Sequence, residues 1–237
     1  MTFCLTGCPT HPHGPVSPPI SVPQAQPGTP EAPGHEPGTS ARIGHPYDVV
    51  SSESLLVILA FRGGTLAKAG HNHVIASHDV RGTFYVPEDV LQSTFELHIP
   101  VGQLSIDEPE LRTQEGTDFP PQVPDSAKEG TRRNMLSEAL LNGAQYPEII
   151  LSSQRMQPGP MGTSVLADVQ VTVRGQSHVI PVPVAYSLVG GELVALGDLR
   201  IKQSDLGLTP FSAMLGALQV QDELRVRFRI VARSLSD

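Results

Sequence analysis

The sequence contains no tryptophan and few aromatic residues of any kind, with four tyrosines and seven phenylalanines among 237 residues. Its only two cysteines, Cys4 and Cys8, lie close to the N-terminus. A disulfide framework therefore cannot hold the rest of the chain together. A domain of about 190 residues does not need one, because it buries roughly 70% of its unfolded surface. The sequence also lacks a CxxC pair, a nucleophile elbow and a phosphate-cradling glycine loop, which favours a protein that is not an enzyme.

Basic residues are scarce: 16 Lys and Arg stand against 24 Asp and Glu, a formal net charge of −8. This balance argues against a nucleic-acid partner, because affinity for a phosphate backbone comes mainly from clustered Lys and Arg. Long apolar runs are missing too. The longest, Leu55–Phe61, has the length of a strand and falls far short of the roughly 20 residues of a membrane-spanning helix.

Proline is plentiful and unevenly placed, since residues 1–46 hold 11 of the 23 prolines. The same segment has almost no large apolar side chains, so it cannot bury enough surface to offset the entropy lost on ordering. We therefore expect residues 1–46 to form a disordered, proline-rich tether. Residues 47–237 are expected to form one folded domain.

The residues Leu5-Thr6-Gly7-Cys8, followed by this tether, resemble a bacterial lipobox. The resemblance predicts acylation of Cys8, anchoring to a membrane and export to the periplasm or cell envelope. Only seven residues precede Cys8, too few for the basic and apolar segments of a signal peptide. Either the true start lies upstream or the match is accidental, and the sequence leaves both alternatives open.

From Tyr47 onward, apolar and polar residues alternate with a period of two, which places successive side chains on opposite faces of a sheet. In the last segment the apolar positions are Leu224, Val226, Phe228 and Ile230. Further strands are predicted at Leu55–Phe61, Val80–Val86, Phe95–Val101, Ile149–Arg155, Val165–Val173, Val179–Leu188 and Val194–Lys202. Turns are predicted at Arg174–Ser177 and Gly190–Gly191.

These elements predict an all-β fold, an antiparallel up-and-down barrel of about eight strands. Closing the sheet covers its apolar face and removes its edges. One inserted helix is predicted over Thr131–Asn142, with a shorter helical turn at Phe211–Leu218. Residues 107–130 hold seven acidic side chains. They are predicted to form a solvated loop, the alternative being a mobile lid over the barrel mouth.

Several ordered segments resemble the YceI-like family of lipocalin-like barrels, and the resemblance runs from Tyr47 to the C-terminus. The segments are Val80–Phe84, Asn142–Ile149, Val169–Gly175, Val179–Val184, Ile201–Leu208 and Asp222–Val226. The resemblance implies a protein of the bacterial periplasm or cell envelope that binds a polyisoprenoid lipid or an isoprenoid quinone in its barrel. It supplies no set of catalytic residues.

A barrel of about eight strands either fills with side chains or encloses one small ligand. The side chains predicted to line the lumen, and so to bind an apolar ligand, are Phe84, Phe95, Leu97, Ile99, Val169, Val171, Val184, Tyr186, Val226 and Phe228. Each buried CH₂ group contributes roughly 0.8 kcal/mol, so a few isoprene units suffice for useful affinity. A bound isoprenoid lipid is the cofactor-like group that a barrel lumen suggests, and a packed core is the alternative.

His71 and His73 are two residues apart, so on a strand both face the same side. A structural or hydrogen-bonding role, contact with a polar ligand head and a metal site are the three interpretations. The metal site would make the protein a metal-binding or redox-associated envelope protein. Its third ligand would come from His78, His98 or His178, among which no spacing selects. A further alternative is an envelope interaction protein whose acidic loop contacts a partner. The sequence fixes neither that partner nor the oligomeric state.

Overall fold

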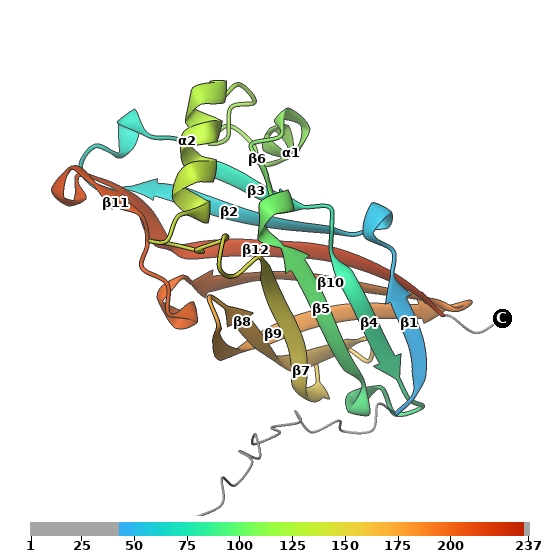
Figure 1. The fold of residues 1–237 in the computed structure, drawn as a ribbon. Coiled ribbons are helices and arrows are strands. Elements are labelled where there is room, and N and C mark those ends of the chain that lie inside the picture. Colours follow the sequence, from blue (N-terminus) through green and yellow to red (C-terminus); the bar gives the residue numbers. More distant parts are fainter. Residues whose placement is uncertain (1–42, 235–237) are drawn as a thin grey trace, which may run out of the picture. The chain divides into compact units, whose positions relative to one another are not determined.

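The computed structural model describes residues 43–234 (Figure 1). Residues 1–42 lie outside the described residues. They include Cys8, whose acylation was predicted, and all of the predicted tether except its last four residues. The first strand begins at His45, two residues before the predicted start of the folded domain at Tyr47.

The described residues form twelve strands and two α-helices. The strands are β1 His45–Val49, β2 Leu55–Gly63, β3 His73–Ser77, β4 Arg81–Val86, β5 Thr94–Pro100, β6 Ser105–Ile106, β7 Glu148–Pro158, β8 Ser164–Val173, β9 Gln176–Val189, β10 Glu192–Lys202, β11 Ser212–Ala213 and β12 Leu218–Ser234. The helices are α1 Pro109–Gln114 and α2 Asp125–Leu136. Neither helix has both the length and the apolar character needed to cross a bilayer.

Eight strands close into a barrel in the order β1-β4-β5-β7-β8-β9-β10-β12. The ring closes where β12 pairs with β1, from Tyr47 opposite Ser234 to Val49 opposite Ala232. Every pairing in the ring is antiparallel. The predicted eight-stranded barrel is therefore confirmed.

Three strands extend the sheet beyond the ring, and the short strand β11 pairs with β12. A 3₁₀ turn at Ser51–Glu53 separates β1 from β2, and both lie against the long strand β12. Strand β3 pairs with β2 and β6 pairs with β3. The outer face of this extension is apolar, because Val57 and Leu59 of β2 pack with Val74 and Ala76 of β3.

The predicted turns lie where the sequence placed them, although the first is shorter than expected. Strand β9 begins at Gln176, so the hairpin turn consists of Arg174 and Gly175 alone. Both have positive φ, at 52° and 70°, as a two-residue hairpin turn requires. Gly190 and Gly191 likewise connect β9 to β10 with positive φ.

The prediction of a helix over Thr131–Asn142 is wrong in its position. Helix α2 begins six residues earlier, at Asp125, where the carboxylate lies in the positively polarised first turn. It ends at Leu136, and Asn142 adopts a left-handed conformation with φ of 47°. The apolar residues after Met135 are nevertheless packed into the core, including Leu140 and Leu141. The spacing of these apolar residues therefore indicated correctly that they are buried, but did not indicate where the helix lies.

The prediction of a solvated acidic loop over residues 107–130 is also wrong. The segment contains α1 and the first half of α2, and Leu111 and Phe119 pack against the outer face of β2 and β3. Both helices therefore lie beside this extension of the sheet (Figure 1), and α1 is not a lid over the mouth. The predicted helical turn at Phe211–Leu218 is mostly wrong as well. Ser212–Ala213 form β11, and only Met214–Gly216 form a tight turn.

Candidate functional site

A cavity of about 230 Å³ lies inside the barrel, and its wall is entirely apolar. It exists because the inward positions of the surrounding strands, β2 included, carry mainly Val, Leu, Ile and Ala, which leave the centre unfilled. All ten side chains predicted to line the lumen do line this cavity: Phe84, Phe95, Leu97, Ile99, Val169, Val171, Val184, Tyr186, Val226 and Phe228. That they bind a ligand stays a prediction.

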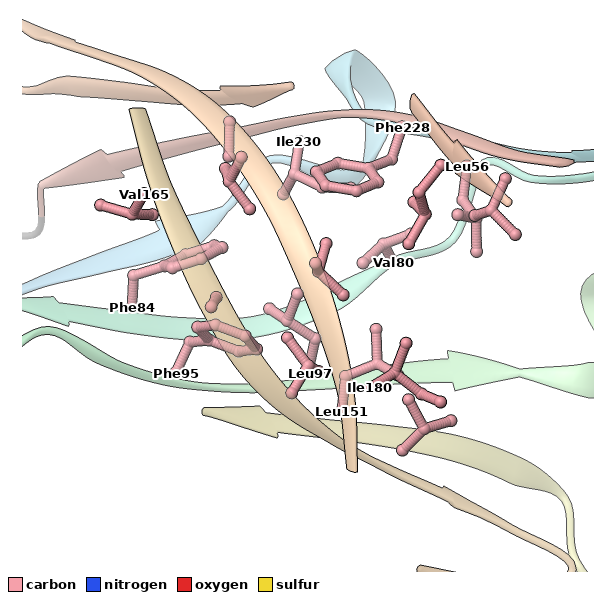
Figure 2. Close-up of a pocket in the computed structure, with 18 of the residues that line it drawn as sticks. Leu56, Val80, Phe84, Phe95, Leu97, Leu151, Val165, Ile180, Phe228 and Ile230 are labelled. Atoms are coloured by element: carbon pink, nitrogen blue, oxygen red, sulfur yellow. The ribbon is translucent and has the colours of Figure 1, made fainter. Parts of the chain in front are cut away.

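Aromatic rings lie on two sides of the cavity. Phe84 of β4 and Phe95 of β5 pack together with ring centroids 5.3 Å apart. Figure 2 shows this pair on one side of the cavity and Phe228 on the other. Tyr186 also lines the cavity, and its hydroxyl donates to the carbonyl oxygen of Gly162 at 3.5 Å.

Apolar side chains from two connecting segments pack at one end of the barrel. Leu141 comes from the segment after α2, and Leu206 and Leu208 follow the end of β10. All three are buried in the core cluster that also contains Leu97 and Ile99. These side chains therefore form an apolar layer at this end of the barrel.

Sequence reasoning missed several residues of the cavity wall. Leu199 and Ile201 of β10, and Ile180 and Val182 of β9, follow the same alternation as the predicted residues, so the signal was present. The other missed residues include Leu56 and Ile58, which lie within an unbroken apolar run. Such a run does not reveal which residues face inward, because both faces of β2 are covered.

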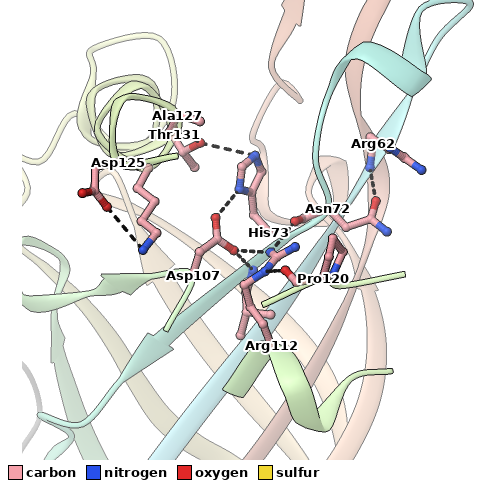
Figure 3. A network of polar contacts seen from close by, with 11 residues as sticks. Arg62, Asn72, His73, Asp107, Arg112, Pro120, Asp125, Ala127 and Thr131 are labelled. Atoms are coloured by element: carbon pink, nitrogen blue, oxygen red, sulfur yellow. Dashed lines mark hydrogen bonds and ion pairs between the residues drawn. The ribbon is translucent and has the colours of Figure 1, made fainter. Parts of the chain in front are cut away.

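His73 belongs to a buried polar network outside the cavity (Figure 3). Its Nδ1 lies 2.6 Å from Asp107 Oδ2, and its Nε2 lies 3.3 Å from the hydroxyl of Thr131 on α2. That hydroxyl donates to the carbonyl oxygen of Ala127, 3.0 Å away. It is therefore engaged within the helix and is not a free nucleophile beside a histidine base.

Asp107 and Arg112 form the centre of this network, and the side chains of both are fully buried. Arg112 Nη1 donates to Asp107 Oδ1 at 2.5 Å and to the carbonyl oxygen of Asn72 at 2.7 Å, while Nε donates to the carbonyl oxygen of Pro120 at 2.6 Å. Burial on its own would raise the pKa of Asp107. The hydrogen bonds from His73 and the Val74 N–H, together with the charge of Arg112, outweigh burial and lower that pKa.

The arrangement supports a hydrogen-bonding role for His73, which ties β3 to α2 and to the segment before α1. The ring of His71 lies 6.3 Å from that of His73, edge to face. Of the suggested third ligands, His78 pairs with Glu108, and His98 lies between Glu148 and Glu96. Within residues 43–234, no group of three or more His, Cys, Asp or Glu side chains is placed to hold a metal ion.

Comparison with known proteins agrees with this geometry. The model of the YceI-like domain family matches residues 52–232. None of the curated proteins matches the sequence. Among solved structures, Burkholderia cenocepacia BcnA is similar with a TM-score of 0.56 and 15% identity, covering 78% of this chain and 99% of that one.

A second similar structure is a polyisoprenoid binding domain from Saccharophagus degradans that is implicated in plant cell wall breakdown. Its TM-score is 0.52 at 12% identity, and the match covers 79% of this chain and 98% of that domain. At these identities the two structures establish a shared fold.

Proposed function

Since the chain belongs to the YceI-like domain family, we propose that it binds a long apolar molecule of the isoprenoid type in its barrel, as a carrier and not as an enzyme. The observation that carries this proposal is the apolar cavity of about 230 Å³ inside the barrel. The description of the Saccharophagus degradans domain as polyisoprenoid binding supports the same ligand class.

The size of the cavity limits what it can hold. A cavity of roughly 150 Å³ in another protein accommodates benzene, with its six carbons. By that scale the lumen has room for roughly nine carbon atoms, or about two isoprene units. Burying them contributes roughly 7 kcal/mol, which falls within the range of the estimated cost of association. Tight binding of a longer chain therefore calls for contacts beyond the lumen.

Native mass spectrometry tests the proposal. The full-length protein, incubated with micromolar geranylgeraniol or all-trans-retinol, is expected to form a one-to-one complex with either molecule, because both present a flexible or polyene apolar chain to the lumen. Sorbitol, a polar molecule without such a chain, serves as the control and should give no adduct. A protein that takes up neither isoprenoid, and that yields no lipid on organic extraction after gentle purification, would refute the proposal.

The proposed location is the bacterial cell envelope, with the protein anchored through an acylated Cys8. The support is the lipobox-like sequence Leu5–Cys8 and the proline-rich segment that follows it. In bacterial cells, Cys8→Ser is expected to shift the protein from the membrane fraction to the soluble fraction, with Cys4→Ser as the matched control. Equal membrane association of both variants, with no fatty-acyl mass on Cys8, would contradict the anchor.

A further inference from the structure

The ladder between β9 and β10 covers only part of the two strands. It consists of five residue pairs, from Val189 opposite Glu192 to Ala185 opposite Leu196. Strand β9 continues to pair with β8 down to Gln176, and β10 pairs with β12 along its whole length. In the part of the chain that the structure describes, residues 176–184 of β9 and 197–202 of β10 therefore lack a shared ladder. In this part of the barrel wall, β9 and β10 lie side by side without pairing.

Two prolines explain why the ladder ends at this point. In an antiparallel strand, successive N–H groups point alternately to the two neighbouring strands. The N–H of Tyr186 donates to Thr163, on the β8 side, so the odd-numbered residues of β9 direct their N–H groups toward β10. Pro181 and Pro183 occupy two such positions and have no N–H to donate.

A groove of about 600 Å³ crosses the outer face of the barrel at the same place. Its wall includes residues 183–185 of β9 and 196–198 of β10, together with Arg227 and Arg229 of β12. Arg227 and Arg229 alternate with Phe228, which lines the lumen, so the groove lies on the opposite face of β12. Three residues, Val165, Val184 and Phe228, border both the groove and the lumen.

The wall between the two spaces is thin at Gly197. A Cβ atom at this position would lie only 2.3 Å from the Cε1 and Cζ atoms of the Phe228 ring and 3.1 Å from the carbonyl oxygen of Pro183. The ring of Phe228 thus fills the space that a side chain at Gly197 would occupy. A ring held by packing alone can change rotamer, and Phe228 is only partly buried.

From these observations we infer that the apolar ligand passes sideways into the barrel between β9 and β10, with the Phe228 ring as the movable gate. The inference rests on the proposed function. A lateral opening also explains how a ligand longer than the lumen could bind. The part of its chain that does not fit into the lumen remains in the adjoining groove. At the opposite end of the same gap, a Cβ atom added at Gly207 would lie 3.0 Å from side-chain atoms of both Gln176 and His178 of β9. The segment after β10 therefore packs against β9 there, and the opening is confined to the middle of the strands.

A cross-link across the gap tests the inference. In the full chain with Cys4 and Cys8 replaced by serine, the pair Val179→Cys and Arg200→Cys is bridged with a bismaleimide. Both positions are solvent-exposed, on β9 and β10 respectively. The matched control bridges Val179→Cys to Gln170→Cys, its partner in the intact β8–β9 ladder. Mass spectrometry verifies each bridge, and stopped-flow fluorescence follows the uptake of all-trans-retinol.

The bridge across the gap is expected to slow both uptake and release of retinol at least tenfold while leaving the equilibrium affinity within about twofold, since both rates pass through the same opening. The control bridge should leave both rates unchanged. Equal rates in the two bridged proteins would overturn the portal alone. Failure of the unbridged chain to take up either retinol or geranylgeraniol would instead overturn the proposed function, and the portal with it.

Removal of the gate provides a second readout that does not depend on forming the bridge. Phe228→Ala is expected to raise the association rate of retinol at least fivefold, because the space above Gly197 becomes open. Phe61→Ala removes an equally large ring from the apolar cluster on the outer face of β2, where it packs against Phe119, and should leave the association rate unchanged. An association rate that is the same in Phe228→Ala as in the unmodified chain would refute the role of Phe228.

Discussion

Replacement of Asp107 by alanine is expected to lower the free energy of unfolding by about 3–5 kcal/mol, because it leaves a buried arginine without its counter-charge. Both side chains of the Asp107–Arg112 pair are fully buried. The other two partners of Arg112 are the carbonyl oxygens of Asn72 and Pro120, which carry no full charge. The substitution also removes the acceptor of the Val74 N–H and the partner of His73.

Urea denaturation of Asp107→Ala beside Glu223→Ala measures this effect against a matched control. Glu223 pairs with Arg200 on the barrel surface, where both side chains are exposed, so its loss should change stability by less than about 1 kcal/mol. Equal losses in the two variants would mean that Arg112 is stabilised without Asp107. Retinol uptake by the folded fraction of Asp107→Ala should be retained, because the network lies outside the cavity.

The same residue gives the protein a characteristic response to acid. The pKa of Asp107 is lowered in the folded state, whereas an unfolded aspartate has a pKa of about 3.9. Its contribution to stability is therefore complete above the unfolded pKa and is lost as the pH falls through the folded pKa. The difference in unfolding free energy between the unmodified chain and Asp107→Asn should accordingly shrink as the pH is lowered below about 4.

The sequence predicted the lumen-facing residues best in strands that have one solvent-exposed face. In β12 the charged residues Arg225, Arg227 and Arg229 mark the outer face, so Val226 and Phe228 could be assigned to the lumen. The periodicity of β8 and β5 worked in the same way. For β2 it could not, because its outer side chains pack under α1 and its inner ones face the cavity. Both faces are then apolar, and no alternation remains.

Composition misled most in residues 107–130, because counting charges does not show which of them pair. Asp107 and Arg112 form a fully buried ion pair, yet the excess of acidic residues indicated a solvated loop. Pro124 followed by Asp125 was an available signal for the start of α2. The only sequence signal for the interrupted β9–β10 ladder was the pair Pro181 and Pro183. Their effect depends on which strand lies beside them, and the order of the strands in the sheet cannot be read from the residues alone.

Replacement of Val171 by tryptophan is expected to weaken binding of geranylgeraniol and retinol at least a hundredfold, equivalent to about 2.7 kcal/mol. Val171 is partly buried on β8 and faces the cavity, so an indole ring there takes up much of the 230 Å³ available. The fold should tolerate the change better than an ordinary core position would, because the ring enters empty space and need not displace close-packed neighbours.

The matched control is Thr172→Trp, whose side chain points to the opposite face of β8, where the threonine hydroxyl lies 2.8 Å from that of Ser177. Because the chain has no tryptophan of its own, the emission of each variant reports on one known position. Val171→Trp should emit at shorter wavelength than Thr172→Trp, since its ring lies in an apolar lumen. If Val171→Trp shows the shorter wavelength yet still binds both isoprenoids with the affinity of the unmodified chain, then the ligand does not occupy the lumen. The outer groove between β9 and β12 would in that case be the next surface to test for binding.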